Sequence, residues 1–233
     1  MMLKKVFTLV TLAVLTLSMS ISSPVFAKAS TVKKQNKDVR VTILLDASGS
    51  MARKVEGERK FDLAKQEVFK FAQSLPKDAK IRMSLFGSEG NNKNSGKAQS
   101  CEVIRGVYGV QPYEKESFEN SLNGLGPNGW TPIARALEHA KQADEQLNNG
   151  TKHIVYLITD GEETCGGDPV KVAKELHNSK GSTVVNVIGL DFNDGYEGQL
   201  KQVAKAGKGH YYQASTGKEM GSILSAESLK LHE

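Results

Sequence analysis

Short apolar runs rich in β-branched residues alternate along this chain with longer segments of helical periodicity. The runs cover residues 39–45, 80–86, 153–159 and 182–190, with a weaker one at 210–214. Each is short and lies close to Gly, Asp or Pro, which is typical of strands. Because the runs are continuously apolar instead of alternating, we expect strands that are buried on both faces of a sheet.

The segments between the runs have the three-four spacing of amphipathic helices. This spacing predicts one helix over 59–75, ended by Pro76, and another over 131–147 that begins near Pro132. Asp168 and Pro169 mark the start of a third helix, which ends by Gly181, and residues 195–209 and 217–233 are expected to form two more. Residues 87–110, rich in Asn, Ser and Gly, predict a long surface loop that leads to one short antiparallel edge strand.

Strands that alternate with helices predict an α/β fold. We expect a doubly wound, mostly parallel sheet flanked by helices on both faces. The mature chain is long enough for one domain with a proper core, which we place at residues 39–233 including the C-terminal helix.

The N-terminal region has the layout of a secretory signal peptide. Two lysines precede an apolar stretch from Val6 to about Met19, and small residues then lead to a cleavage site after Ala27. The alternative, a membrane anchor, would need an apolar core of about 20 residues. We therefore predict a signal peptide at 1–27 and a basic flexible leader at 28–38. Secretion follows, with release or loose surface retention outside the cell.

The charge of the chain is only mildly positive. The formal net charge is +5 and falls to +3 without Lys4 and Lys5 of the signal peptide. Basic residues are interleaved with acids, which is typical of a solvated surface and argues against a nucleic-acid partner. The mature chain also has no segment that is apolar enough to span a membrane.

Two cysteines, Cys101 and Cys165, are present. A secreted protein meets an oxidising compartment, so a disulfide between them is the leading interpretation, and two free buried thiols are the alternative.

The stretch "LLDASGSM", residues 44–51, places an acid and two hydroxyls directly after the first apolar run: Asp46, Ser48 and Ser50. Asp160 follows another apolar run in "YLITDGEE", and Thr131 lies in the loop that opens a helix in "GWTPIARAL". Ligands of open α/β sheets bind at the carboxyl ends of the strands, so these side chains are expected to converge there. The alternative is that Asp46 and Ser48 only cap a turn.

An all-oxygen set of this kind suits a hard divalent cation. Mg²⁺ is the leading candidate, with Mn²⁺ and Ca²⁺ as alternatives, and the lack of His or Cys in these motifs argues against zinc. Few carboxylates and several neutral hydroxyls leave positive charge on the ion. Such a site attracts an acidic group from a partner.

These three motifs resemble those of von Willebrand factor A-type domains. "DASGSM" matches the DxSxS signature of the family, and "GWTPIARAL" and "ITDGEE" are similar to its threonine loop and its final aspartate loop. The resemblance spans essentially the whole mature chain, with the motifs in the family's order. It implies a doubly wound sheet with a metal-ion-dependent adhesion site (MIDAS), where the ion is held by Asp46, Ser48, Ser50 and Thr131, with Asp160 bound directly or through water.

The chain is especially similar to secreted bacterial members of this family, on the run "DGEETCGGDP". That similarity implies that Cys165 is bonded to Cys101, which would hold the 87–110 segment beside the metal face.

Together these features predict a secreted, non-enzymatic binding or adhesion module. Its metal would bind a carboxylate of a protein or cell-envelope partner. A metal-dependent hydrolase is the alternative, for which Glu162 and Glu163 are the available general bases. A structural or assembly protein that its metal stabilises is a third hypothesis.

Overall fold

The computed structural model describes residues 39–145, 151–179, 181–190 and 197–232. The predicted signal peptide, 1–27, and the predicted leader, 28–38, lie outside these residues. No helix in the described part of the chain combines the length and the apolar character needed to cross a membrane.

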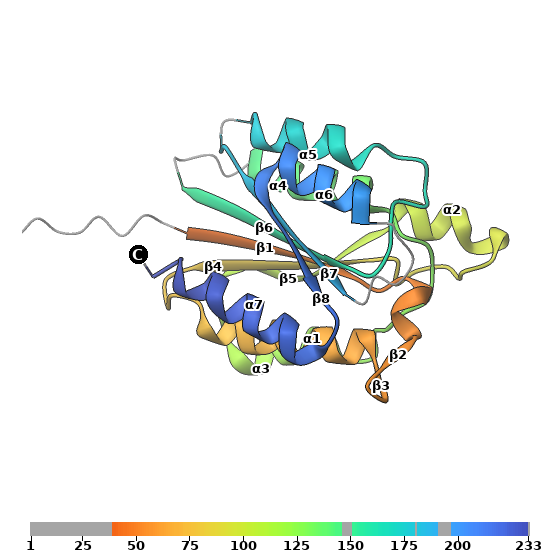
Figure 1. The fold of residues 1–233 in the computed structure, drawn as a ribbon, viewed down its shortest axis with the longest axis horizontal. Helices are drawn as coiled ribbons and strands as arrows, with labels where there is room; N and C mark the ends of the chain where they lie inside the picture. The colour runs from red at the N-terminus through yellow and green to blue at the C-terminus, as the bar shows by residue number, and fades with distance from the viewer. Residues whose placement is uncertain (1–38, 146–150, 180, 191–196, 233) are drawn as a thin grey trace, which may run out of the picture. The chain divides into compact units, whose positions relative to one another are not determined.

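A six-stranded sheet forms the centre of the domain, in the order β5-β4-β1-β6-β7-β8 (Figure 1). Neighbouring strands run parallel except β5, which lies at one edge and pairs antiparallel with β4. This confirms the predicted doubly wound, mostly parallel sheet with an antiparallel edge strand. The strands are β1 (Val39–Asp46), β4 (Lys80–Phe86), β5 (Ile104–Gln111), β6 (Lys152–Thr159), β7 (Val184–Leu190) and β8 (Lys208–Ala214).

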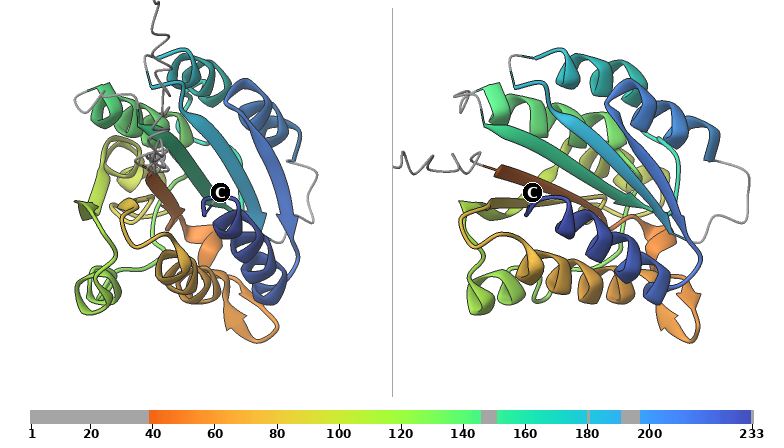
Figure 2. Two further views of the ribbon diagram at one scale, coloured as in Figure 1. Left: turned by 90° about the vertical axis from the view of Figure 1, so that its left-hand side faces the viewer. Right: turned by 60° about the vertical axis from the view of Figure 1, so that its left-hand side comes forward.

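Helices cover both faces of this sheet (Figures 1 and 2). One face carries α1 (Lys60–Ser74), α3 (Lys115–Asn120) and α7 (Gly217–Leu229). The other carries α4 (Ile133–Glu145), α5 (Pro169–His177) and α6 (Glu197–Ala206). All of these except the short α3 were predicted by the helical spacing. The start of α5 is also as expected, since Asp168 accepts a hydrogen bond from the backbone N–H of Lys171 and Pro169 follows it.

The central strand β1 shows why its sequence is continuously apolar. Val41 and Ile43 pack in the same buried cluster as Phe61 of α1, on one face of the sheet. Leu44 points the other way, into a cluster that includes Leu137 of α4. A strand covered on both faces needs apolar residues at odd and even positions alike.

The prediction of one long loop over 87–110 was wrong in part, because this segment contains the helix α2 (Asn94–Glu102). Only Gly96 and Ser100 of this helix are buried, so α2 lacks the apolar stripe that makes a helix visible in a sequence. A small hairpin of β2 (Lys54–Val55) and β3 (Glu58–Arg59) was also not predicted. Both additions lie at the carboxyl end of the central strands (Figure 1).

Candidate metal centre

The predicted site residues lie where the sheet changes its winding direction. From the end of β1 the chain passes through α1 to β4 on one side, whereas the strand on the other side of β1 is β6, which follows α4. The loop after β1 leads to α1 on one face of the sheet, and the loop after β6 leads to α5 on the other face. The two loops therefore diverge at this point. Ligands bind α/β sheets at such a position.

The first loop brings Asp46, Ser48 and Ser50 together through a short 3₁₀ helix, η1 (Gly49–Ala52). The backbone N–H of Ser48 donates to Asp46 Oδ1 at 2.6 Å. The backbone N–H of Met51 donates to the Ser48 carbonyl at 3.0 Å, and the Met51 side chain is buried beneath the turn. This tight turn holds the hydroxyl oxygens of Ser48 and Ser50 3.1 Å apart.

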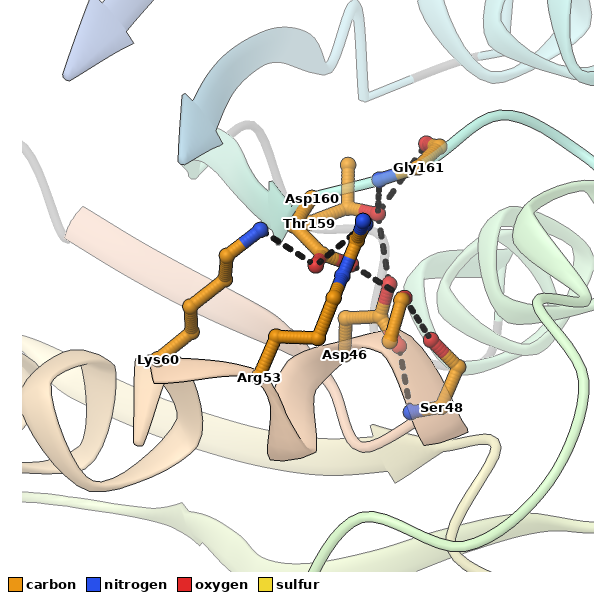
Figure 3. Close-up of polar contacts among 8 residues, drawn as sticks. Asp46, Ser48, Arg53, Lys60, Thr159, Asp160 and Gly161 are labelled. Atoms are coloured by element: carbon orange, nitrogen blue, oxygen red, sulfur yellow. Dashed lines mark hydrogen bonds and ion pairs between the residues drawn. The ribbon is translucent and has the colours of Figure 1, made fainter. Parts of the chain in front are cut away.

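The loop after β6 contributes Asp160 to the same group. The Ser50 hydroxyl donates to Asp160 Oδ1 at 2.5 Å. The hydroxyl of Thr159, the last residue of β6, donates to Asp46 Oδ2 at 2.6 Å, which ties the two carboxylates to one network (Figure 3). Thr159 was not among the predicted site residues, because a threonine at the end of a strand has no distinctive pattern.

Thr131 approaches from the third loop. Its backbone N–H donates to Thr164 Oγ1 at 2.8 Å, which fixes the loop against the segment that follows β6. The hydroxyl oxygens of Thr131 and Ser50 lie 3.9 and 4.0 Å from the point where a Cβ on Gly161 would stand. The two hydroxyls therefore face the same glycine, although they come from different loops.

Gly87, directly after β4, allows these loops to approach. Its backbone carbonyl accepts from the N–H of Gly129 at 2.7 Å, and its φ of +75° is in the left-handed region. A Cβ on Gly87 would lie 2.5 Å from the Trp130 carbonyl oxygen and 2.8 Å from the backbone nitrogen of Ser48. Gly87 was not among the predicted site residues, since only the folded loops show how closely they pass.

The carboxylates of Asp46 and Asp160 lie close enough to repel each other when both are ionised. Asp46 is fully buried, and burial together with the neighbouring Asp160 carboxylate raises the pKa of Asp46 to about 7. The hydroxyls of Ser48, Ser50 and Thr131 add three neutral oxygens to these two acids. A hard divalent cation prefers this donor chemistry and would favour the ionised form of both acids, so the residues present fit such an ion.

Two cations that the sequence analysis did not identify also face Asp160 (Figure 3). Lys60 Nζ lies 3.0 Å from Asp160 Oδ2, and both side chains are almost completely buried. Arg53 Nη2 lies 3.8 Å from the same oxygen, but its side chain is 59% exposed. Nothing in the local sequence distinguishes these two residues from the surface Lys and Arg around them.

Glu163, one of the two candidate general bases of the hydrolase alternative, accepts hydrogen bonds from the backbone. Its Oε2 accepts from the N–H of Ala134 in the first turn of α4 at 2.7 Å, and its Oε1 accepts from the N–H of Cys165 at 2.7 Å. Both oxygens of Glu163 are therefore engaged in fixing the loops that carry Thr131 and Asp160.

The insertion that contains α2 is fastened beside this centre. Cys101 of α2 and Cys165 of the loop after β6 form a disulfide, which confirms the predicted pairing. Trp130, the neighbour of Thr131, lies against α2 as well: its indole N–H donates to the Lys93 carbonyl at 3.3 Å, and Lys97 Nζ lies 4.0 Å from the ring centroid.

Comparisons with known proteins agree with this architecture. The sequence model of the von Willebrand factor type A domain matches residues 41–226. YwmC of Bacillus subtilis (strain 168) is 52% identical over 229 residues, which cover 98% of this chain and 99% of that protein.

Two solved structures show the same fold. BatB from Bacteroides thetaiotaomicron is 21% identical, with a TM-score of 0.66, over 83% of this chain and 98% of that one. Proximal thread matrix protein 1 from the mussel byssus, solved with a zinc-occupied MIDAS motif, is 16% identical, with a TM-score of 0.59, over 83% of this chain and 46% of that one. The chain therefore belongs to the von Willebrand factor type A domain family.

Proposed function

We propose that this protein is a secreted binding module that uses a divalent cation to bind an acidic group of a protein or cell-envelope partner. Mg²⁺ is the leading candidate for this cation. Secretion rests on the predicted signal peptide. The metal ligands would be Asp46, Ser48, Ser50, Thr131 and Asp160, which form a MIDAS.

The observation that carries this proposal is the meeting of the three loops. Ser48, Ser50 and Asp160 are joined by hydrogen bonds of 3.1 and 2.5 Å, although Asp160 is 110 residues away from Ser50 in the sequence. Thr131 faces the same glycine as Ser50. A turn cap would explain Asp46 and Ser48 alone, but it would not explain why oxygens from three loops gather at one point.

The charges around the centre favour an acidic ligand. The negative charges of Asp46 and Asp160 are partly balanced by the buried ammonium of Lys60. A bound divalent cation would supply a coordination position for an outside oxygen ligand and would leave the site with net positive charge. The zinc-occupied MIDAS of the mussel byssus protein supports the assignment of a divalent metal to this fold, and Mn²⁺ or Ca²⁺ could replace Mg²⁺ here.

A hydrolase would need a general base beside the metal. Glu163 does not suit that role, because both of its oxygens accept backbone hydrogen bonds. This weakens the hydrolase alternative, for which Glu162 remains as the second candidate base.

The test is a pull-down from secreted and envelope fractions with the purified protein in Mg²⁺ and in chelator. We expect one or more partners that are retained only with Mg²⁺ and are lost with the Asp46→Ala variant. A partner that remains bound in chelator and to the variant would contradict the proposal.

A further inference from the structure

Arg53 is held at the edge of the metal centre by the backbone on both sides of it. Its N–H donates to the carbonyl of Ser50 at 3.0 Å, and its own carbonyl accepts from the N–H of Lys60 at 2.9 Å. Two hydrogen bonds thus fix the Cα of Arg53 between a predicted metal ligand and the start of α1. Its long side chain extends over Asp160 and remains 59% exposed (Figure 3).

Asp160 already has a positively charged partner other than Arg53. Lys60 Nζ already contacts Asp160 Oδ2 at 3.0 Å, and its side chain is only 1% exposed. Arg53 Nη2 is 3.8 Å from the same oxygen, which is longer than a hydrogen bond, and an ion pair so exposed to water contributes little. The guanidinium can therefore give up this contact at small cost.

We infer that Arg53 is a second anchor for the carboxylate of the partner, beside the metal. This inference rests on the proposed function. A guanidinium presents several N–H donors in one plane, a geometry that matches a carboxylate and that neutral oxygen ligands use less well. Arg53 thus selects a charged acid over a hydroxyl or an amide, and binds it on the solvent side of Asp160.

The chain offers a matched control in Arg59. This arginine ends β3, in the hairpin that directly follows Arg53, and its side chain is 50% exposed, but its guanidinium is bound to Asp62 at 2.6 Å. The substitutions Arg53→Gln and Arg59→Gln remove the same charge. Only the first removes a guanidinium that faces Asp160.

The experiment measures two quantities for the wild type and both variants of the mature chain. Calorimetry gives the affinity for Mg²⁺ alone, and a biosensor gives the affinity for immobilised poly-L-glutamate in Mg²⁺ and in chelator. We expect Arg53→Gln to weaken polyglutamate binding by about tenfold or more, the loss that follows removal of a charged hydrogen-bond donor. Arg59→Gln should change it less than about twofold. The affinity for Mg²⁺ alone should not fall in either variant, because each substitution removes a positive charge that repels the cation.

Equal losses in the two variants would overturn the inference, because a general positive field would then explain the binding. A loss of Mg²⁺ affinity in Arg53→Gln that accounts for its weaker binding would overturn it as well. Either result would leave the proposed function standing. If the wild type binds polyglutamate equally well in chelator, or does not bind it in Mg²⁺, the proposed function fails and the inference fails with it.

Discussion

At the scale of single residues, the centre depends on how closely three loops can pass one another. Gly87 stands between the backbone of Ser48 and the Trp130 carbonyl, with a φ of +75°. Any Cβ at this position would overlap the carbonyl oxygen and would strain the left-handed backbone.

We expect Gly87→Ala to lower the free energy of unfolding by about 1–3 kcal/mol, since both overlap and backbone strain act against the native state. Urea denaturation measures this loss. Gly109→Ala is the control, because a Cβ at that position of β5 meets nothing within 4 Å. Two variants of equal stability would show that the loops have room to spare.

Sequence patterns located some of the site residues and not others, for a physical reason. Asp46 and Asp160 could be predicted because Asp46 ends the buried strand β1, Asp160 directly follows the buried strand β6, and the strand ends of a parallel sheet meet at one edge. Gly87, Lys60 and Arg53 matter only through their distances to other loops. These contacts form only when the sheet brings the loops together, so a local sequence pattern cannot predict them.

At the scale of elements, α2 is a helix that its own sequence barely supports. It buries only Gly96 and Ser100, and the disulfide from Cys101 to Cys165 fastens it to the loop that carries Asp160. The two cysteines are 64 residues apart in the sequence. In the chain-entropy model, closing a loop of this length raises the free energy of the unfolded chain by about 4 kcal/mol.

Replacing Cys101 and Cys165 together by Ser should therefore lower the free energy of unfolding by about 2–4 kcal/mol. Chemical denaturation with and without a reductant provides the measurement and its control. The reductant should destabilise the wild type and leave the double variant unchanged. A thiol titration that finds free cysteines in the native, unreduced protein would contradict the crosslink itself.

Helix α7 is joined to the sheet by a buried carboxylate. Glu227 accepts from Tyr156 of β6 at 3.1 Å, from Asn186 of β7 at 2.9 Å and from Tyr212 of β8 at 2.6 Å, and Lys230 adds an ion pair. Burial raises the pKa of Glu227, but the hydrogen bonds from Lys230, Tyr212 and Tyr156 outweigh burial and hold the pKa below the ordinary 4.5. The ionised form is thus the one that the native state prefers.

A carboxyl group whose pKa is lower in the folded than in the unfolded chain stabilises the protein at any pH above its unfolded-state pKa. This stabilisation is lost as the pH falls through its folded-state pKa. We expect Glu227→Gln to lower the free energy of unfolding by about 1–3 kcal/mol near neutral pH. The NH₂ group of glutamine is a hydrogen-bond donor, and it would face side chains that are themselves donors. The difference from wild type should shrink as the pH falls below about 4.5.

Urea denaturation at a series of pH values measures this difference. Glu175→Gln is the control, since the pKa of Glu175 is also lowered, through its bond to Lys141, but on the exposed surface of α5. A difference between wild type and Glu227→Gln that stays constant with pH would exclude the proposed preference for the ionised carboxylate.

At the scale of the whole molecule, the alternation of apolar runs and helical segments was sufficient to predict the doubly wound sheet. Each of the predicted strands is present. The inner strands β1, β4, β6 and β7 are buried almost throughout, and a strand buried on both faces leaves a continuous apolar run. The edge strand β8 is partly or fully exposed over most of its length and left only a weak run. Of the parts that were missed, α3 and the hairpin of β2 and β3 are short, and α2 lacks an apolar stripe. They depend on contacts with the rest of the fold, so their sequences carry little signal of their own.

The proposed function requires a single divalent cation to bind where the loops after β1 and β6 meet the loop before α4. The proposed role of Arg53 requires the same ion.

A crystal of the mature protein grown with Mn²⁺ would locate this ion, because Mn²⁺ is visible by anomalous scattering. We expect one anomalous peak among the oxygens of Ser48, Ser50 and Thr131, with Asp46 and Asp160 beside it. No peak at this position at saturating Mn²⁺, with Ser50 still bonded to Asp160 as in the structure described above, would contradict this expectation.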